Sequence, residues 1–357
     1  MLKEVDLHVT NRCNLSCSYC FFNSGRLTMK ELNQEDMIKI AKDARELGAN
    51  ELHVTGGEPL LRKDIFGILK SCVDLGFNVR LQTNGLLLNK SKINHLKRLG
   101  VLDLMVSIDG MENNHDLLRN RKGAFQKTLS NTITAIQNGM SVRINSVVFR
   151  ENASDMIPLL KKTTAIGADV HSFFYPTLFD NSDSIHNLQA EEWLKFLDDI
   201  GTALVQISNK NMKLIIEKAF ASELEIGKGD ISCKLLEKEH AVVLCDGRVF
   251  PCVMFTHSKN ELGIVNSSQA FAKIWKNDSL WKSYSNLLKN YRCRKCQLSP
   301  KCRGGCIASN LSQEWTMNCG LRQQKENIIA ICPTLKLNLS TMKIASSSAD
   351  AILEDNN

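Results

Sequence analysis

The sequence predicts an α/β protein, a partial (β/α)6 barrel followed by a small cysteine-rich domain. Over the first half of the chain, short apolar segments alternate with longer amphipathic ones, with about 25 to 40 residues per unit. That alternation is typical of parallel strands joined by right-handed helical crossovers. From Cys233 onward the pattern breaks into short segments among cysteines, glycines and charged turns, which predicts a separate small domain.

Six strands and five helices are expected in the barrel. The strands are residues 4–9, 51–55, 78–83, 103–108, 142–148 and 169–175. The helices are residues 34–48, 63–76, 89–99, 124–139 and 153–166. The first helix has an apolar stripe that includes Met37, Ile40 and Ala44, and Gly48 marks its end. Six units are enough for a partial barrel but not for a closed eight-stranded one.

The domain limits follow changes in this pattern. The barrel takes residues 1–185, a helical bridge residues 186–232, and the cysteine-rich domain residues 233–335. The bridge rests on a charged, helical stretch at about 189–222. The serine-rich, acidic tail at 340–357 is predicted to be poorly ordered.

A β-hairpin is expected early in the cysteine-rich domain. The apolar segments 242–244 and 248–250 flank Asp246-Gly247, a dipeptide typical of tight hairpin turns. Asp246 is also a candidate catalytic base, as are Asp180 and Asp183.

Composition indicates a globular enzyme of the cytoplasm. The chain has 357 residues, of which 43% are hydrophobic and 23% charged. No apolar run approaches the roughly 20 residues of a membrane span. The N-terminus, Met1-Leu2-Lys3-Glu4, carries an acidic residue where a secretory signal has its basic and apolar regions. We therefore predict a cytoplasmic protein without a membrane partner.

The 13 cysteines are unevenly placed, with three in the first 20 residues and nine between Cys233 and Cys332. In a cytoplasmic protein this predicts metal or redox chemistry rather than a disulfide framework. Cys72 stands alone on an apolar helical face and is predicted to be a core residue. Cys332, before Pro333, is predicted to be structural.

The cysteines after the first strand, Cys13, Cys17 and Cys20, are spaced C-x3-C-x2-C, with Tyr19 before the last. Four thiolates close a [4Fe–4S] cube, so three leave one iron open. A zinc knuckle or buried thiols are the alternatives. The spacing resembles that of the radical S-adenosylmethionine (radical SAM) superfamily. The resemblance implies a cluster whose open iron chelates the amino and carboxyl groups of SAM.

Polar residues where strands end fit the same resemblance. Gly56-Gly57-Glu58-Pro59 follows the second strand and matches the GGE motif of the family. We expect the two glycines to let the backbone approach a ligand closely. Further SAM contacts are expected from Asn84, Ser107 and Asn145 at later strands and from Arg119. A hydroxyl can pair with ribose and a guanidinium with a carboxylate, whereas the alternatives are ordinary turns and a surface arginine.

The later cysteines resemble the SPASM domain of peptide- and protein-modifying radical SAM enzymes. The pattern is Cys233, Gly247 and Cys252, then C-x2-C-x5-C-x3-C from Cys293, and a final cysteine. A single tetrahedral zinc takes only four ligands, so zinc fits this set poorly. The resemblance implies two auxiliary [4Fe–4S] clusters and three clusters in all. Their implied ligands are Cys233, Cys252 and Cys306 for the first cluster, and Cys293, Cys296, Cys302 and Cys319 for the second.

Cys245 leaves an open question about the first auxiliary cluster. It is the nearest candidate for a fourth ligand. If Cys245 is not a ligand, the cluster has an open iron that can bind substrate. Alternatively, Cys245 is a hydrogen-atom donor.

The resemblance implies reductive cleavage of SAM to a 5′-deoxyadenosyl radical, which abstracts hydrogen from a substrate. It favours a ribosomally synthesised peptide, with crosslinking, thioether formation or epimerisation as the outcome. Tetrapyrrole or other small-molecule modification is the alternative, and a pure electron-transfer protein is the non-enzyme one. In the sulfatase-maturing members that the chain resembles, a catalytic aspartate directly follows the corresponding cysteine. Here Val253 follows Cys252, so the resemblance disfavours sulfatase maturation.

The partners expected are a peptide and an electron donor such as flavodoxin or ferredoxin. Because the first strand begins near residue 4, a separate leader-recognition protein or direct recognition is expected. Nucleic acid is not expected. The formal charge is +7, but thiolates on three clusters would lower it by about four or five charges.

Overall fold

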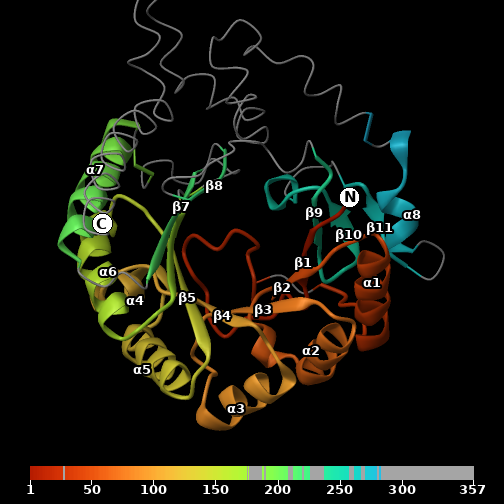
Figure 1. Cartoon of the computed structure of the whole chain (residues 1–357), viewed down its shortest axis with the longest axis horizontal. Coiled ribbons are helices and arrows are strands. Elements are labelled where there is room, and N and C mark those ends of the chain that lie inside the picture. Colours follow the sequence, from red (N-terminus) through yellow and green to blue (C-terminus); the bar gives the residue numbers. More distant parts are fainter. Residues whose placement is uncertain are drawn as a thin grey trace, which may run out of the picture.

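The computed structural model describes residues 1–26, 29–174, 176, 187–188, 190–207, 212–218, 221–225, 237–256, 261–266, 270–279 and 281–282. They form one strongly curved sheet with helices along its outer face (Figure 1). Its strand order is β11-β10-β9-β1-β2-β3-β4-β5-β6-β7-β8. The order is linear, so among the described strands the barrel is open between β11 and β8. No helix in these ranges is both long and apolar enough to cross a membrane.

The six predicted strands are confirmed to within one residue at each end. They are β1 (Glu4–His8), β2 (Glu51–Thr55), β3 (Asn78–Thr83), β4 (Asp103–Ser107), β5 (Ser141–Val147) and β6 (Val170–Phe174). All neighbours among them pair in parallel. Because parallel strands point the same way, their carboxyl ends meet at one edge of the sheet, where ligands bind in such folds.

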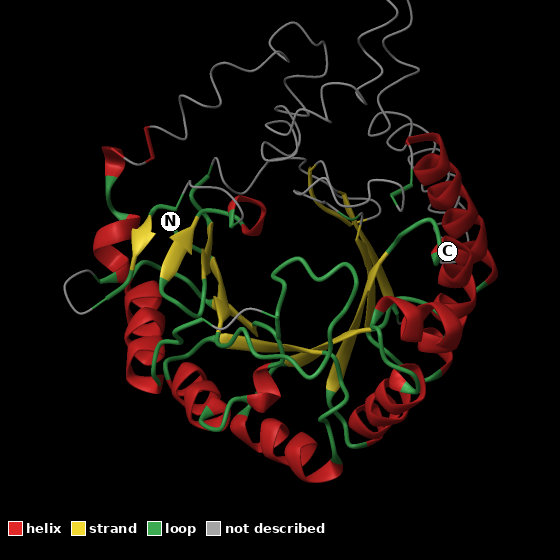
Figure 2. Ribbon diagram, turned by 180° about the vertical axis from the view of Figure 1, so that it is seen from behind, coloured by secondary structure: helices red, strands yellow, loops and turns green. Residues whose placement is uncertain are grey.

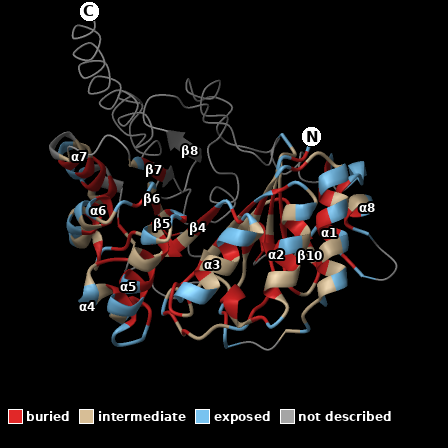
Figure 3. Cartoon of the chain, turned by 60° about the horizontal axis from the view of Figure 1, so that its bottom comes forward, coloured by how far each residue is buried: buried red, intermediate tan, exposed pale blue. Residues whose placement is uncertain are grey.

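The five predicted helices are also present. They are α1 (Gln34–Glu46), α2 (Ile65–Asp74), α3 (Lys90–Leu99), α5 (Ala124–Gln137) and α6 (Met156–Ala165). Each buries one face against the sheet and exposes the other, as the buried and exposed stripes in Figure 3 show. The short helix α4 (Glu112–Leu118) was not predicted and precedes Arg119. Cys72 is fully buried in α2, as predicted for a core residue.

The helical bridge predicted over 189–222 is wrong in its second half. Helix α7 is Ala190–Gln206, and the chain then forms β7 (Lys213–Lys218) and β8 (Ala221–Glu225). β7 pairs in parallel with β6, so the parallel sheet continues past its sixth strand. The apolar run Leu214-Ile215-Ile216 contains two β-branched residues and suits a strand better than a helix.

The predicted hairpin is confirmed as β9 (His240–Val243) and β10 (Arg248–Phe250), which pair antiparallel. A short strand β11 (Gly263–Ile264) follows, and helix α8 (Phe271–Trp275) packs near α1. β9 also pairs in parallel with β1 over four residues. The hairpin from the cysteine-rich region is therefore built into the barrel sheet.

Polar side chains of β1, β2 and β9 bind one another on the face opposite the helices. His53 Nδ1 lies 3.1 Å from Glu4 Oε1 and 3.2 Å from Asp6 Oδ1. His240 Nε2 of β9 lies 3.1 Å from Asp6 Oδ2. These contacts link β9 to β1 through side chains as well as through the backbone ladder.

Candidate metal and cofactor site

The loop after β1 lies inside the curve of the sheet (Figure 1; seen from behind as the central green loop in Figure 2), and it carries the three N-terminal cysteines. Cys17 is buried, and Cys13 and Cys20 are partly exposed. Leu15 anchors the loop by packing with Leu86 and Ala124 in a small apolar cluster. The loop therefore presents three thiols at the carboxyl edge of the strands.

The Gly56-Gly57 turn after β2 holds this loop in place. Gly57 N donates to Thr10 O at 2.7 Å, and Glu58 N donates to Arg12 O at 2.8 Å. A Cβ at Gly56 would lie 2.4 Å from Thr10 O, and one at Gly57 would lie 2.2 Å from Arg12 O. The space beside both glycines is thus filled by the cysteine loop. Close approach of these glycines to SAM stays a prediction.

Glu58 points to the end of β3. Its buried carboxylate accepts hydrogen bonds from Thr83 Oγ1 at 2.9 Å, Asn84 N at 2.8 Å and Leu60 N at 3.1 Å. Burial raises the pKa of Glu58, and these donors oppose the shift. Both oxygens are engaged, so Glu58 joins the β2 turn to β3 rather than facing open space.

Each sulfur of the loop has its own hydrogen-bond donor. Asn84 Nδ2 lies 3.9 Å from Cys13 Sγ, and Arg119 Nη1 lies 3.9 Å from Cys17 Sγ. Ser24 N donates to Cys20 Sγ at 3.3 Å. Burial raises the pKa of Cys17, whereas the positive charge of Arg119 lowers it. Hydrogen bonds to sulfur are a main control on iron–sulfur chemistry.

Arg119 is paired with Asp109, a residue that the sequence reasoning missed. Asp109 is fully buried and accepts from Arg119 Nε at 2.7 Å, from Arg119 Nη2 and from Tyr19 OH. Its other oxygen accepts from Val147 N at 2.9 Å. The guanidinium expected to bind the SAM carboxylate is therefore engaged by Asp109. Asp109 could have been found from the sequence, because it directly follows the fourth predicted strand and lies two residues after Ser107.

A row of polar side chains crosses the sheet next to the cysteine loop. Ser107 of β4 is in register with Asn145 of β5, and Asn145 with Ser172 of β6. Asn145 Oδ1 and Ser172 Oγ are buried and have no hydrogen-bond partner among the described residues. Ser172 was also missed. Buried polar atoms are rarely left unpaired, so these two fit a ligand that brings hydroxyl or amino groups.

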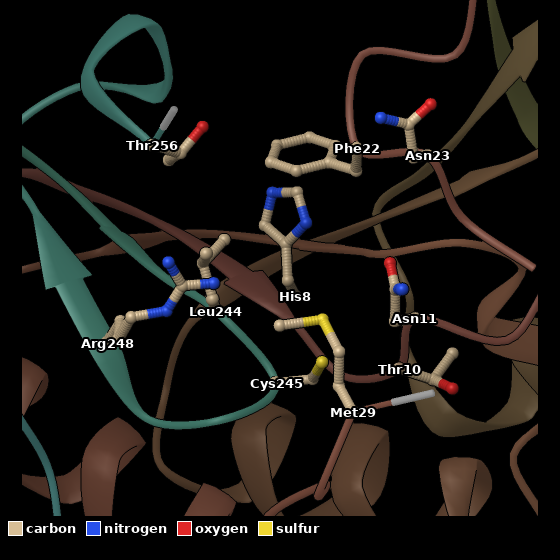
Figure 4. Close-up of a pocket in the computed structure, with 10 residues that line it drawn as sticks. All are labelled: His8, Thr10, Asn11, Phe22, Asn23, Met29, Leu244, Cys245, Arg248 and Thr256. Carbon is tan, nitrogen blue, oxygen red and sulfur yellow. The ribbon is translucent and has the colours of Figure 1, made fainter. Parts of the chain in front are cut away.

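A pocket of about 280 Å³ lies between the cysteine loop and the β9–β10 hairpin (Figure 4). His8 and Cys245 are on its walls, and Asn11 and Phe22 flank the cysteines. Burial lowers the pKa of His8 to about 4 and raises that of Cys245 to about 12. Both side chains are therefore neutral near pH 7 when no metal is bound to them.

Two family profiles match the chain. That of the radical SAM superfamily covers residues 7–163, and that of the SPASM iron–sulfur cluster-binding domain covers residues 233–303. The chain belongs to the radical SAM superfamily. The cysteine loop, Ser107 and Asn145 lie within the radical SAM match, and the SPASM match begins at Cys233.

Its relatives include peptide- and heme-modifying proteins. The sporulation killing factor maturation protein SkfB of Bacillus subtilis is 30% identical over 56% of this chain and 47% of its own length. The chain thus spans about half of SkfB. The AdoMet-dependent heme synthase of Methanosarcina barkeri is 26% identical over 83% of this chain and 88% of its own.

The fold is shared with SuiB of Streptococcus suis, solved with S-adenosylmethionine. The TM-score is 0.71 and the identity 18%, over 87% of this chain and 74% of SuiB. SuiB has also been solved bound to its precursor peptide SuiA. Together with the two profiles, this likeness confirms the predicted partial-barrel fold with a SPASM region.

In the SPASM region, Cys245 and Cys252 lie at opposite ends of β10. Cys245 is in the turn between β9 and β10, which Leu244 N closes by donating to Arg248 O at 2.9 Å. Cys252 lies two residues after Phe250, the last residue of β10. A three-residue strand spans about 10 Å. The other predicted SPASM ligands lie outside the described residues, as do Cys332, Asp180 and Asp183.

Asp246, a candidate base, sits in the same turn. Its carboxylate accepts from Arg248 Nε at 2.8 Å and from Arg248 N at 3.2 Å. Asp246 is thus paired with Arg248. Of these two residues, Arg248 and not Asp246 lines the pocket beside Cys245.

Proposed function

We propose that this radical SAM enzyme binds a [4Fe–4S] cluster at Cys13, Cys17 and Cys20 and cleaves SAM to modify a ribosomally synthesised peptide. The observation that carries SAM cleavage is the juxtaposition of three thiols, each with its own donor, and the unsatisfied Asn145 and Ser172. Three thiolates with a neighbouring polar ligand site fit a cluster with one open iron.

The residues of the site hold and orient these groups. When bound, the cluster supplies the electron that cleaves SAM to methionine and a 5′-deoxyadenosyl radical, which abstracts hydrogen from the substrate. Ser107, Asn145 and Ser172 offer hydroxyl and amide groups to the polar parts of SAM. Gly56 and Gly57 keep the cysteine loop against β2, and Tyr19 is fixed by Asp109.

Two auxiliary [4Fe–4S] clusters are part of the proposal, because the SPASM profile matches residues 233–303, which include Cys233, Cys252, Cys293, Cys296 and Cys302. Their ligand sets are those implied by the resemblance. We propose that Cys245 is not a ligand of the first set, because it lines the pocket beside the N-terminal cysteine loop, whereas Cys252 lies beyond the other end of β10. That cluster then keeps an open iron, unless a residue outside those described completes it.

A peptide is the favoured substrate. SkfB is a maturation protein for a killing factor, and SuiB binds a precursor peptide. The pocket beside Cys245 has about 280 Å³, near the lower end of ligand-site volumes of about 300–1,000 Å³. That volume suits one amino-acid residue better than a whole tetrapyrrole.

The reaction outcome is a crosslink, a thioether or an epimerised residue. The proposal also includes an electron donor, such as flavodoxin or ferredoxin, and a cytoplasmic location. Heme-pathway chemistry is the second candidate, because the Methanosarcina barkeri heme synthase matches 83% of this chain.

The test is anaerobic incubation of the reconstituted full chain with SAM and dithionite. We expect 5′-deoxyadenosine and methionine, and loss of both products in Cys17→Ala. About twelve irons per chain support three clusters and about eight support two, whereas about four contradict the auxiliary clusters. No 5′-deoxyadenosine from iron-loaded protein would reject the enzyme proposal.

A substrate screen then separates the two candidates. Short peptides encoded beside the gene and an iron porphyrin are each added to the reaction. Mass spectrometry of the added compound reads the outcome. A modified peptide supports maturation, and a modified porphyrin with unmodified peptides would replace it with the heme-pathway candidate.

A further inference from the structure

Arg119 joins the cysteine loop to a buried carboxylate. Its Nε and Nη2 atoms both bind Asp109, which leaves Nη1 free to face Cys17 Sγ at 3.9 Å. The guanidinium therefore lies between the sulfur and the carboxylate. Its carbon Cζ is 5.5 Å from the centre of the Tyr19 ring, and Tyr19 OH donates to the same carboxylate.

Asp109 is held on every side. Val147 N donates to its second oxygen at 2.9 Å, and Asn152 Nδ2 donates to its carbonyl at 2.6 Å. Its own N–H donates to His115 Nδ1 at 3.1 Å. Arg119 is 9% exposed and Asp109 fully buried. The pair is thus preorganised and shielded from solvent, so its charges act on the cluster loop with little screening.

We propose that Arg119 sets the reduction potential of the cluster bound at Cys17, and that Asp109 limits the size of this effect. The inference goes beyond SAM cleavage but rests on the proposed cluster. A positive charge and an N–H donor beside a thiolate favour the electron-rich, reduced cluster. The negative charge of Asp109 acts in the opposite direction from the far side of the guanidinium.

The opposed charges predict opposite shifts in two variants of the full-length, reconstituted protein. Asp109→Asn leaves the Arg119 charge uncompensated, so the potential becomes more positive than that of the wild type. The double variant Asp109→Asn/Arg119→Met has no charge and no donor to Cys17, so its potential becomes more negative. Removing both charges also avoids a buried unpaired ion, which is strongly destabilising.

The reduction potential is measured in an anaerobic redox titration that is monitored by electron paramagnetic resonance. The N-terminal cluster is identified as the signal that changes when SAM is added. Arg121→Met is the matched control, because Arg121 also binds the loop, through Asn14 O at 3.3 Å, but is exposed to solvent. We expect no shift in this control, since water screens its charge.

The outcomes separate this inference from the proposed function. The order Asp109→Asn, wild type, double variant, from most positive to most negative, supports it. Unshifted potentials, or shifts of one sign in both variants, overturn it and assign the pair a purely structural role. If Asp109→Asn does not fold, the double variant still decides, because a potential at or above that of the wild type overturns the inference. A wild type without a SAM-responsive signal would instead contradict the proposed cluster.

Discussion

At the scale of residues, Glu58 differs from Asn145 and Ser172 in whether its buried polar atoms find partners in the described chain. Glu58 uses both oxygens on donors of its own chain, so its burial is compensated. Asn145 and Ser172 carry buried oxygens with no partner in the described part of the chain. An unpaired buried polar atom costs about 1–3 kcal/mol, which a ligand can recover.

Asn145→Leu tests this distinction. We expect the Kd for SAM to rise roughly 5- to 30-fold, the equivalent of about 1–2 kcal/mol. The free energy of unfolding without SAM should stay equal or increase, because the unpaired oxygen is gone. Binding titration and chemical denaturation measure the two quantities. Asn138→Leu at the end of α5 is the control and should leave the Kd unchanged. An unchanged Kd in Asn145→Leu would remove Asn145 from the SAM site.

At the scale of elements, the β2 turn and the cysteine loop form one unit. Their backbones approach so closely that no side chain fits at either glycine. The GGE motif therefore positions the loop that carries the proposed cluster ligands.

Gly57→Ala is expected to displace the loop, because its Cβ would lie 2.2 Å from Arg12 O. Iron analysis should show loss of about four irons per chain, and the SAM-responsive resonance signal should disappear. Gly201→Ala in α7 is the matched control, since nothing lies within 4 Å of its added Cβ. Full iron content in Gly57→Ala would show that the loop tolerates the methyl group.

The hairpin separates the roles of its two cysteines. Cys245→Ala should retain the iron content of the wild type, because Cys245 lines the pocket beside the N-terminal cysteine loop and lies across β10 from Cys252. Cys252→Ala should lower the iron content. Equal loss in both variants would make Cys245 a ligand.

At the scale of the whole molecule, the sheet runs across the predicted domain boundary. β9 lies beside β1, and its residues Ala241, Val242 and Val243 are fully buried. The barrel core thus depends on residues beyond 233.

A chain cut after residue 232 should therefore fail to fold as a stable barrel. The cut exposes the edge of β1 and removes the apolar cover of β9, and exposed edges promote aggregation. Size-exclusion chromatography and circular dichroism of the fragment and the full chain measure this. A monomeric, cooperatively unfolding fragment would show that the barrel is independent of the hairpin.

Prediction from sequence succeeded where the signal is local. The strands from β1 to β6 and the helices between them follow from apolar periodicity, and the thiols from their spacing. Prediction failed at β7, because no local feature of its apolar run shows which strand it pairs with. It also failed at Asp109 and Ser172, because their roles depend on residues distant in the sequence.

The sequence by itself determined the family of this protein, the six parallel strands from β1 to β6 and the cysteine loop. These depend on short-range patterns that can be read along the chain. Only the tertiary structure decided that Gly56 and Gly57 meet the cysteine loop and that Arg119 faces Asp109. It also decided that β9 completes the barrel beside β1. Such pairings join residues far apart in sequence, and burial decides which polar atoms find partners.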